Sequence, residues 1–572
     1  MRPAIPEGRL RDAGLRGYER FMGLAVGMKT STRITLNTAT NWAYSGLRAL
    51  IQLAMVPFLL EKLGTSGYGI IGLVGVIVSS TELLDMGLRS GLGRHLAFEI
   101  ARKDYRRFNE LASTGLATYL ILGSLFASAC IILARPIAAL FKVPPELVNQ
   151  AVFLIRVYGG LSILVYFLQP VFNATIIGEN RFDIRNYLDM GYTVVQGGLL
   201  FAVLGLTSYG LMGYTLVSSG TLVLSLLARV WAAKRLWPSM RLSPRFVRLD
   251  AFKPMLSLGS KLFVFHLTRF ISIRSDPIII TRFFGPAGVA LYTPGLSLPA
   301  MADQIIGGFR GQLETVATRF HAVGEKARLH ALLIRGTKYT LLMGIAACVI
   351  LGVFAHSIIK VWLGRRLGES YQITAWFMVG WSVVYLASYA AGTQWAVLMA
   401  VNRMNFITKL NVASGIINVL ASIYLAGFTP LGVLGVIIPT AILANITRPI
   451  VSIHTARVCG LPVRRYFWEA YARPLVVLVI LAAIGLALRF AVNPQTLLSL
   501  AACVAAVALA WLPLCWWVGF DKEDKKRFGG IADGIRKKIG LSPRNGRVPA
   551  DSPPQTPSPA GTADDEESDL PC

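Results

Sequence analysis

The sequence predicts an all-α protein that crosses a membrane many times, and three observations lead to this fold class. Of its 572 residues, 54% are hydrophobic and 15% are charged, whereas soluble domains have about 45–50% apolar and roughly 25% charged residues. The mean hydropathy is +0.56. Apolar runs of about 18 residues or more recur along the chain, and each can cross a bilayer core of about 30 Å as a helix. This composition excludes a soluble enzyme.

About 14 apolar segments are predicted to be transmembrane helices. They lie at approximately residues 36–60, 67–88, 111–133, 151–176, 187–207, 210–230, 255–281, 288–308, 338–359, 373–400, 407–427, 432–453, 474–492 and 496–518. The first 35 residues hold seven basic residues and no early apolar region followed by a small-residue cleavage site, which argues against a cleaved signal peptide.

The loops between these segments alternate sharply in charge. One set, taken with both termini, carries about 43 Lys and Arg residues, and the other set carries about 8. Because Lys and Arg collect on the cytoplasmic side of membrane proteins, both termini are predicted to be cytoplasmic, in a multi-pass protein of the inner cell membrane. The net charge of +27 therefore reflects topology, and no nucleic-acid partner is expected.

Three sequence marks recur at nearly the same spacing. The pairs are Gly64-x-x-Gly67 with Gly285-x-x-Gly288, Gly178–Phe182 with Ala400–Met404, and Gly210/Gly213 with Gly432/Gly435, at offsets of 221, 222 and 222 positions. Segments one to six and seven to twelve are therefore predicted to be two six-helix repeats that form a two-lobed bundle, with two extra helices. Transporters built from such repeats bind substrate near the midplane, between the halves.

The predicted organisation follows from this duplication. It comprises a basic cytoplasmic N-terminal segment (1–35), an N-terminal six-helix lobe (36–231), a basic cytoplasmic linker (232–254), a C-terminal six-helix lobe (255–453), helices 13 and 14 (474–518), and a cytoplasmic tail (519–572). The tail beyond about residue 545 is rich in Pro, Ser and acidic residues and is predicted to be disordered. The predicted outer loops are short and leave no room for an external catalytic domain.

Arginines inside the predicted helices indicate a binding site. A central Arg costs at least about 2.5–3.5 kcal/mol to insert, so it normally faces a protein interior or a wet cavity. Arg48 and Arg269 are 221 positions apart, which makes them equivalent residues of the two lobes. Asn41 and Gln52 share a helix face with Arg48, and Arg274 lies at a depth close to that of Arg269. We predict that these residues bind substrate, because an arginine fork matches phosphate oxygens bidentately.

The acidic residues in the predicted helices include Glu82, Asp85, Asp276 and Asp303. Such carboxylates can relay protons or hold Na⁺ in a coupled carrier. They can equally be counter-ions of the arginines, pairing Arg269 with Asp276 or Arg48 with Glu82 or Asp85. Both alternatives stay open.

Other polar residues in the predicted helices are expected to reach the membrane surface or to join helices. Arg448 is expected to reach the cytoplasmic surface by extending along its helix. Polar stripes on two segments are expected to join helices; they comprise Tyr385, Ser388, Tyr389 and Gln394, and Asn411, Ser414, Asn418 and Ser422.

Motifs for catalysis are lacking. The sequence has no P-loop, HExxH, GxSxG or DxD pair, its six histidines are scattered, and its six cysteines show no CxxC spacing. We therefore predict that the protein is not an enzyme and that it uses no cofactor or metal centre.

Several short stretches carry a resemblance to a known family. They are Leu63–Gly69, Leu83–Leu88, Gly178–Asn186 and Ser275–Gly285, with Tyr292 following. Over about residues 36–453 the sequence resembles the Wzx-type lipid-linked oligosaccharide flippases, the polysaccharide-export branch of the multidrug/oligosaccharidyl-lipid/polysaccharide (MOP) exporter superfamily. Segments thirteen and fourteen are as in fourteen-helix members such as the lipid II flippases.

The resemblance implies a two-lobed, V-shaped bundle with a cationic central cavity for a pyrophosphate head group. Arg48 and Arg269 would then hold the pyrophosphate, with Arg274 a weaker candidate, and Asp85 and Asp276 match acidic positions of the family pattern. The long basic N-terminus and the acidic tail lie outside the shared core.

The function that we expect is translocation of undecaprenyl-diphosphate-linked oligosaccharide repeat units across the cytoplasmic membrane. These units would serve surface polysaccharide biosynthesis (O-antigen, capsule or exopolysaccharide). The expected partners are the polyprenyl-diphosphate-linked oligosaccharide, membrane lipids, and a polysaccharide polymerase and chain-length regulator. The alternatives are a cation-coupled multidrug exporter of the same superfamily, a membrane polysaccharide polymerase or ligase, and an accessory scaffold. An arginine-rich cavity argues against the exporter, and short outer loops argue against the polymerase or ligase.

Overall fold

The structure is a computed structural model that describes residues 30–81, 85, 88–179 and 181–529. The side chains of residues 30–35, 38, 90, 249, 251–274, 311, 312 and 315 lie outside this description. The chain forms two units, Met1–Gly519 and Phe520–Cys572. In the second unit residues 522–529 are helical, and Asp521 and Asp524 each accept a hydrogen bond from the other's backbone N–H, at 2.8 and 3.1 Å.

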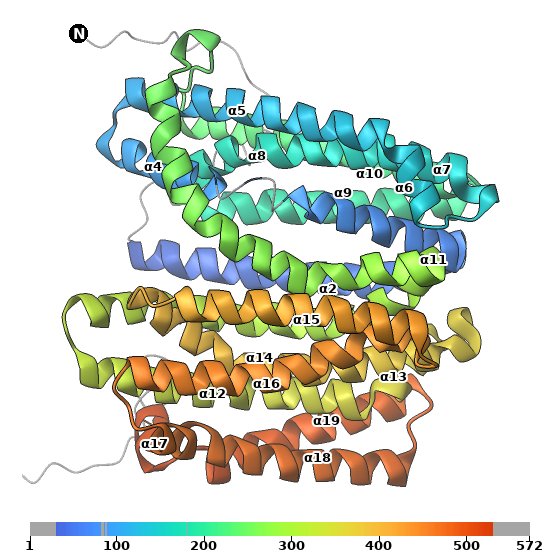
Figure 1. Ribbon diagram of the computed structural model, residues 1–572, viewed down its shortest axis with the longest axis vertical. Helices are drawn as coiled ribbons and strands as arrows, with labels where there is room; N and C mark the ends of the chain where they lie inside the picture. Colours follow the sequence, from blue (N-terminus) through green and yellow to red (C-terminus); the bar gives the residue numbers. More distant parts are fainter. Residues whose placement is uncertain (1–29, 82–84, 86–87, 180, 530–572) are drawn as a thin grey trace, which may run out of the picture. The chain divides into compact units, whose positions relative to one another are not determined.

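The described part of the first unit is built from helices, which confirms the predicted all-α class (Figure 1). The α-helices are α2 (Thr30–Ser79), α4 (Leu88–Arg102), α5 (Tyr105–Ile132), α6 (Ala134–Leu140), α7 (Val148–Leu154), α8 (Gly160–Gly178), α9 (Phe182–Leu206), α10 (Gly210–Leu236), α11 (Leu249–Ala322), α12 (Lys326–Val353), α13 (Ala355–Leu367), α14 (Tyr371–Ala400), α15 (Asn405–Phe428), α16 (Ile437–Val458), α17 (Val463–Phe467), α18 (Arg473–Val492) and α19 (Leu497–Leu514). Short 3₁₀ and π turns connect or extend them.

Eleven helical stretches of the described residues are long and apolar enough to cross a membrane. One of them, Ala39–Ser79, covers two predicted segments, because α2 breaks at Gly64. Predicted segments seven and eight lie within α11, which breaks at Gly285. The helices therefore account for the predicted segments, and the chain is a multi-pass membrane protein. The sequence did not predict α4, which lies in a region read as a loop, or the part of α13 beyond residue 359.

The internal duplication is visible in the backbone. Gly64 and Gly285 have φ values of 68° and 70°, and each breaks a long helix into two. Gly210 and Gly432 also have matching φ values, of 52° and 54°. A third pair, Lys103 and Gly324, has φ values of 58° and 74°. Positive φ is open to glycine at little cost and strained for most other residues. Three matched positions, 221 or 222 residues apart, confirm the predicted repeat.

Each repeat packs its own helices together. In the first half, α5 packs on α8 and α9 on α10, around buried residues such as Phe108 and Phe167. In the second half, α14 packs against α11, α12 and α16, around Tyr292, Phe377 and Trp381. The two extra helices, α18 and α19, lie against α12, on its far side from the first half (Figure 1).

The two halves meet where α2 packs along α11. A Cβ atom added at Gly69 would lie 1.8 Å from the carbonyl oxygen of Pro286, so the two backbones touch there. Nearby, Trp362 Nε1 donates to the carbonyl oxygen of Leu53 at 2.9 Å. These contacts lie at the end of the helices that the charge pattern assigns to the outside.

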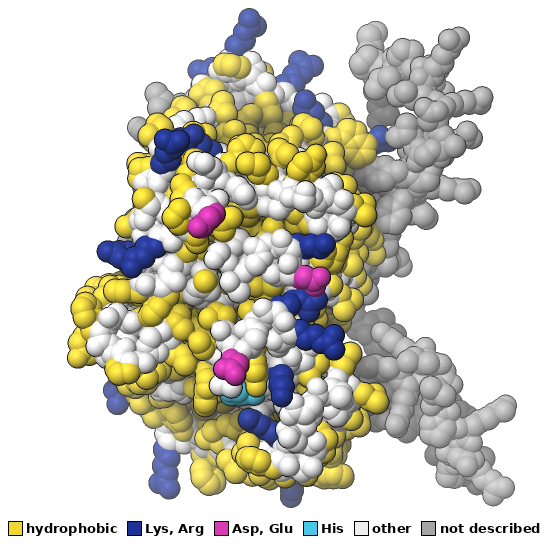
Figure 2. All heavy atoms as spheres, turned by 90° about the vertical axis from the view of Figure 1, so that its right-hand side faces the viewer, with side chains coloured by type: hydrophobic (Ala, Val, Ile, Leu, Met, Phe, Trp, Pro, Cys, Tyr) yellow, Lys and Arg dark blue, Asp and Glu magenta, His cyan; other side chains and the backbone are white. Residues whose placement is uncertain are grey.

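Figure 2 faces this same end of the helices. On this face the Lys, Arg, Asp and Glu side chains lie among hydrophobic and uncharged ones, and several basic groups lie beside acidic ones. One of the ion pairs at this end joins the two halves: Arg366 of α13 and Glu61 of α2 are 2.7 Å apart.

Candidate functional site

The structure places the residues that we predicted to bind substrate on α2 and α11. On α2, the side chains of Asn41 and Arg48 are exposed and that of Gln52 is half-buried. Arg269 and Arg274 belong to α11, but their side chains lie outside the described part of the chain. The cationic pair of Arg48 and Arg269 therefore stays a prediction.

The predicted acidic residues have different surroundings. Glu82 lies outside the described residues. Asp85 is buried at the start of α4, where its carboxylate accepts the backbone N–H of Arg89 at 3.2 Å. Arg89 is the second residue of α4, so this hydrogen bond satisfies one of the backbone N–H groups that are left free at the start of a helix. Asp303 is half-buried and forms an ion pair with Arg310.

Among the described acids of this set, Asp276 is the most buried, with no exposed surface. The Tyr292 hydroxyl lies 3.5 Å from its Oδ2 atom, and the Thr440 hydroxyl is also beside the carboxylate. Its Oδ1 atom has no hydrogen-bond partner among the described residues. A carboxylate in neutral surroundings is stable only if it holds a proton or a cation.

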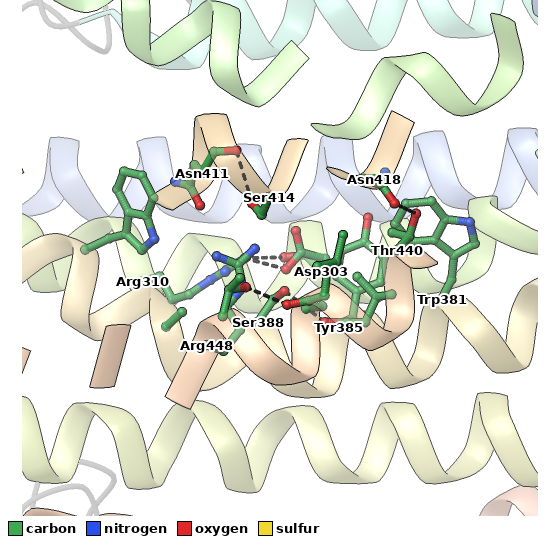
Figure 3. Close-up of a pocket in the computed structure, with 16 residues that line it drawn as sticks. Asp303, Arg310, Trp381, Tyr385, Ser388, Asn411, Ser414, Asn418, Thr440 and Arg448 are labelled. Carbon is green, nitrogen blue, oxygen red and sulfur yellow. Dashed lines mark hydrogen bonds and ion pairs between the residues drawn. The ribbon is translucent and has the colours of Figure 1, made fainter. Parts of the chain in front are cut away.

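A pocket of about 430 Å³ lies within the second half, between α11, α14, α15 and α16 (Figure 3). Its described lining combines arginines, aromatic rings, amides and hydroxyls. The lining residues are Asp303, Arg310, Trp381, Val384, Tyr385, Ser388, Ala391, Trp395, Asn411, Ser414, Asn418, Thr440, Leu443, Ala444, Thr447 and Arg448.

Arg310 is held at one side of this pocket by two interactions. It points to Asp303, with which it forms the ion pair drawn in Figure 3. Its guanidinium carbon also lies 5.8 Å from the ring centre of Tyr389, within the range of a cation–π contact. Gly392 makes room for this side chain, because a Cβ atom there would lie 2.2 Å from Arg310 Cδ.

Arg448 differs from Arg310 because no carboxylate among the described residues forms an ion pair with it. Its Nε atom is buried without a hydrogen-bond partner among the described residues, and its side chain lines the pocket. The expectation that Arg448 reaches the cytoplasmic surface is wrong. Arg448 lies in the middle of α16, ten residues before the helix ends at Val458, which is about 15 Å along the axis.

Buried arginines of the first half show the contrast. Arg181 binds Asp183 at 2.9 Å, and both side chains are no more than 5% exposed. Arg229 pairs with Asp189 and also donates to Asn173 Oδ1 at 2.9 Å. Within the described part of the chain, these two arginines each have an acidic partner and Arg448 has none.

The two polar stripes have divided roles. Gln394 joins helices, as expected, by donating to Ser452 at 2.7 Å and to Tyr466 at 3.0 Å. Tyr385, Ser388, Asn411, Ser414 and Asn418 line the pocket instead. Sequence reasoning missed this site because its lining comes from four helices. The sequence signal that could have indicated the pocket was the presence of both polar stripes and Arg448 in the same repeat.

The sequence matches the model of one protein family, described as "Polysaccharide biosynthesis protein", over residues 63–372. This match covers more than half of the chain. The chain belongs to this polysaccharide biosynthesis protein family. The membership fits the resemblance to polysaccharide-export flippases.

This polysaccharide biosynthesis protein is similar to other membrane proteins over most of its length. It is 20% identical over 499 residues to the "Uncharacterized membrane protein EpsK" of Bacillus subtilis (strain 168), covering 86% of this chain and 97% of the relative. Its fold is similar to an inward-facing multidrug resistance MATE family transporter of the MOP superfamily, with a TM-score of 0.61 and 17% identity over 72% of this chain and 94% of the other. It is also similar to the lipid II flippase MurJ in an inward closed conformation. The TM-score is 0.60 and the identity is 14%, over 84% of this chain and 98% of the MurJ chain.

Together these similarities confirm the MOP fold. The family model shows membership of the polysaccharide biosynthesis protein family, and the similarity to the MATE transporter and to MurJ is a similarity of fold.

Proposed function

We propose that the protein is a flippase for undecaprenyl-diphosphate-linked oligosaccharide repeat units. It moves them from the cytoplasmic to the outer leaflet of the inner membrane, with both termini in the cytoplasm. The repeat units then serve a polymerase and chain-length regulator that assemble O-antigen, capsule or exopolysaccharide. The observation that carries the proposal is the polarity of the pocket: among its described side chains, the charge without an opposite partner is the positive charge of Arg448.

This polarity favours the flippase over the alternative, a cation-coupled multidrug exporter. A pocket for cationic drugs requires an unpaired acid at its surface, whereas Asp303, the acid that lines this pocket, is paired with Arg310. The amides and aromatic rings suit a glycan, because a few placed polar groups on apolar walls are typical of small-molecule sites.

Alternating access supplies the mechanism. A glycan and a diphosphate cannot enter hydrocarbon unaided, because desolvating ionised groups is too costly. A cavity between the halves replaces their hydration while the polyprenyl tail stays in lipid. Arg48, Arg269 and Arg274 bind the diphosphate, and Asn41 and Gln52 assist from α2. Separation of Gly69 from Pro286 then opens the outer end of the cavity.

Asp276 is the candidate for ion coupling. Of the predicted acids, Asp85 accepts a backbone N–H at the start of α4 and Asp303 neutralises Arg310, so both already have structural roles. Asp276 has neutral oxygen neighbours and no cationic partner among the described residues. Uptake of a proton or Na⁺ at Asp276 can therefore bias one state of the transporter over the other.

The test is the fate of the lipid-linked oligosaccharide in cells that lack the gene. We expect the undecaprenyl-diphosphate glycan to accumulate on the cytoplasmic leaflet, and the intact gene to reverse this. Arg48→Ala and Arg269→Ala, at normal abundance in the membrane, should fail to restore transport. Normal glycan traffic combined with altered sensitivity to cationic drugs would instead identify a multidrug exporter.

A further inference from the structure

We infer that the pocket around Arg448 binds an acidic sugar of the transported glycan, a pyranose that carries one carboxylate. This inference rests on the proposed flippase function and names the chemistry of its substrate. It concerns a subsite within the second half, separate from the residues of α2 proposed for the diphosphate.

The first argument is charge. The described charged side chains of the pocket are Asp303, Arg310 and Arg448. Asp303 and Arg310 neutralise each other, which leaves one positive charge. A single carboxylate balances this charge, whereas a diphosphate would bring excess negative charge into a partly desolvated site. Asp276 does not line the pocket, and its own charge is offset by the proton or cation proposed above.

The second argument is an excess of unused hydrogen-bond donors. Arg448 Nε and Trp381 Nε1 are buried without partners among the described residues. Asn418 accepts a hydrogen bond from Thr440 at 3.1 Å, so its side-chain NH₂ remains available. Buried donors are normally satisfied by protein, water or ligand. A uronic acid, with carboxylate, ring and hydroxyl oxygens, supplies the acceptors that these donors lack.

The third argument is the shape and surface of the pocket. Trp381, Tyr385 and Trp395 supply aromatic walls, on which the C–H faces of a pyranose can pack. Small-molecule pockets occupy about 300–1,000 Å³. The volume of about 430 Å³ is at the lower end of that range. It suits a single sugar or a short piece of glycan, and it is too small for the whole lipid-linked repeat unit.

The experiment measures tryptophan fluorescence of the purified full-length protein in detergent during titration with sodium glucuronate, glucose or pyrophosphate. Trp381 and Trp395 line the pocket, and the other nine of the eleven tryptophans contribute a background signal that the wild type and the Arg448 variants share. We expect saturable quenching by glucuronate, and at least about tenfold weaker binding of glucose, since a charged hydrogen bond contributes about 1.5–3 kcal/mol. Pyrophosphate should not compete with glucuronate.

Arg448→Gln tests the residue that carries the inference. It should abolish the preference for glucuronate over glucose and leave the weak binding of glucose unchanged. The glucuronate-to-glucose ratio is therefore the measured quantity, because a loss of folded protein lowers both signals equally. Arg448→Lys should keep part of the preference. Arg457→Gln is the matched control, since Arg457 is an exposed arginine in the last turn of the same helix.

Three outcomes would overturn the inference: no saturable glucuronate binding, a preference that survives Arg448→Gln, or Arg448-dependent binding of pyrophosphate that displaces glucuronate. None of these would contradict the flippase, which can carry a neutral glycan. The proposed function fails separately, if deletion of the gene leaves glycan transport normal.

Discussion

Gly69 of α2 and Pro286 of α11 lie in backbone contact across the two halves of the molecule. A methyl group at position 69 would come within 1.8 Å of the Pro286 carbonyl oxygen. The neighbouring Gly72 repeats this closeness, because its added Cβ would lie 3.0 Å from Val289 Cγ1. Both contacts are close to the helix breaks at Gly64 and Gly285. The equivalent turns of the two repeats therefore hold the halves together at one end.

Replacement of Gly69 by alanine should weaken this contact. Pro286 is fixed in its backbone, so the halves must move apart, at a cost of about 1–3 kcal/mol for overpacking. We expect a lower melting temperature of the purified protein and loss of transport. Gly75→Ala is the control, because nothing lies within 4 Å of its added Cβ. Equal melting temperatures for both variants would contradict a tight contact at Gly69.

Glu61 and Arg366 provide a weaker connection between the halves. The side chains are 56% and 32% exposed, and their ion pair measures 2.7 Å. Exposed pairs contribute about 0.2–1 kcal/mol, so Glu61→Arg should lower the melting temperature slightly. The exchange Glu61→Arg with Arg366→Glu should recover it. A double-mutant cycle with zero coupling would show that the pair contributes nothing.

Asp276→Asn should separate coupling from binding. The amide keeps the shape of the side chain but can neither hold a proton nor bind a cation electrostatically. In vesicles supplied with lipid-linked oligosaccharide, we expect transport to become independent of the proton or Na⁺ gradient. Asp104→Asn is a control, since Asp104 caps the start of α5. Transport that still responds to the gradient in Asp276→Asn would assign coupling to another group.

Asp303→Asn tests the pairing of Arg310. The change leaves Arg310 without its carboxylate and gives the pocket two positive charges. Removing one partner of a fully buried pair costs about 3–5 kcal/mol, and less is expected here because the side chains are 28% and 21% exposed. Glucuronate affinity should rise while thermal stability falls. If affinity falls together with stability, the pocket does not recognise a carboxylate by charge.

The membrane orientation can be tested with single cysteines. Glu146 and Arg245 are exposed and lie in loops assigned to opposite sides. In intact cells a membrane-impermeant maleimide should label Glu146→Cys but not Arg245→Cys, and permeabilised cells should label both. Labelling of Arg245→Cys in intact cells would reverse the orientation. The native Cys459 should react slowly, because burial raises its pKa to about 11 and leaves little thiolate at neutral pH.

Local patterns predicted the helices well. Apolar length identified the segments, since each membrane helix must satisfy its own backbone and be apolar over the bilayer core. The duplication was also readable, because glycine is favoured where the backbone turns to positive φ, as it does at Gly64 and Gly285. The short helix α4 and the part of α13 beyond residue 359 escaped prediction, since they are less apolar than a membrane segment.

The candidate pocket was less predictable. Its side chains come from α11, α14, α15 and α16, so no segment contains the pattern. The sequence spacing of the polar residues on α15 is the same whether its asparagines join helices or face a cavity, so the pattern does not distinguish the two roles. Arg448 was read as a surface residue because a charge near a helix end usually reaches water.

Composition, charge alternation and repeated glycines are properties of short stretches, so the sequence by itself determined the fold class, the repeat and a predicted orientation. Pairing of charges depends on which helices become neighbours. Only the tertiary structure decided that Arg310 has Asp303 as its counter-ion, that Asp276 lies beside the hydroxyls of Tyr292 and Thr440, and that Arg448 has no carboxylate partner among the described residues. The physical reason is that desolvation and ion pairing act between groups distant in sequence, through distances that packing alone sets.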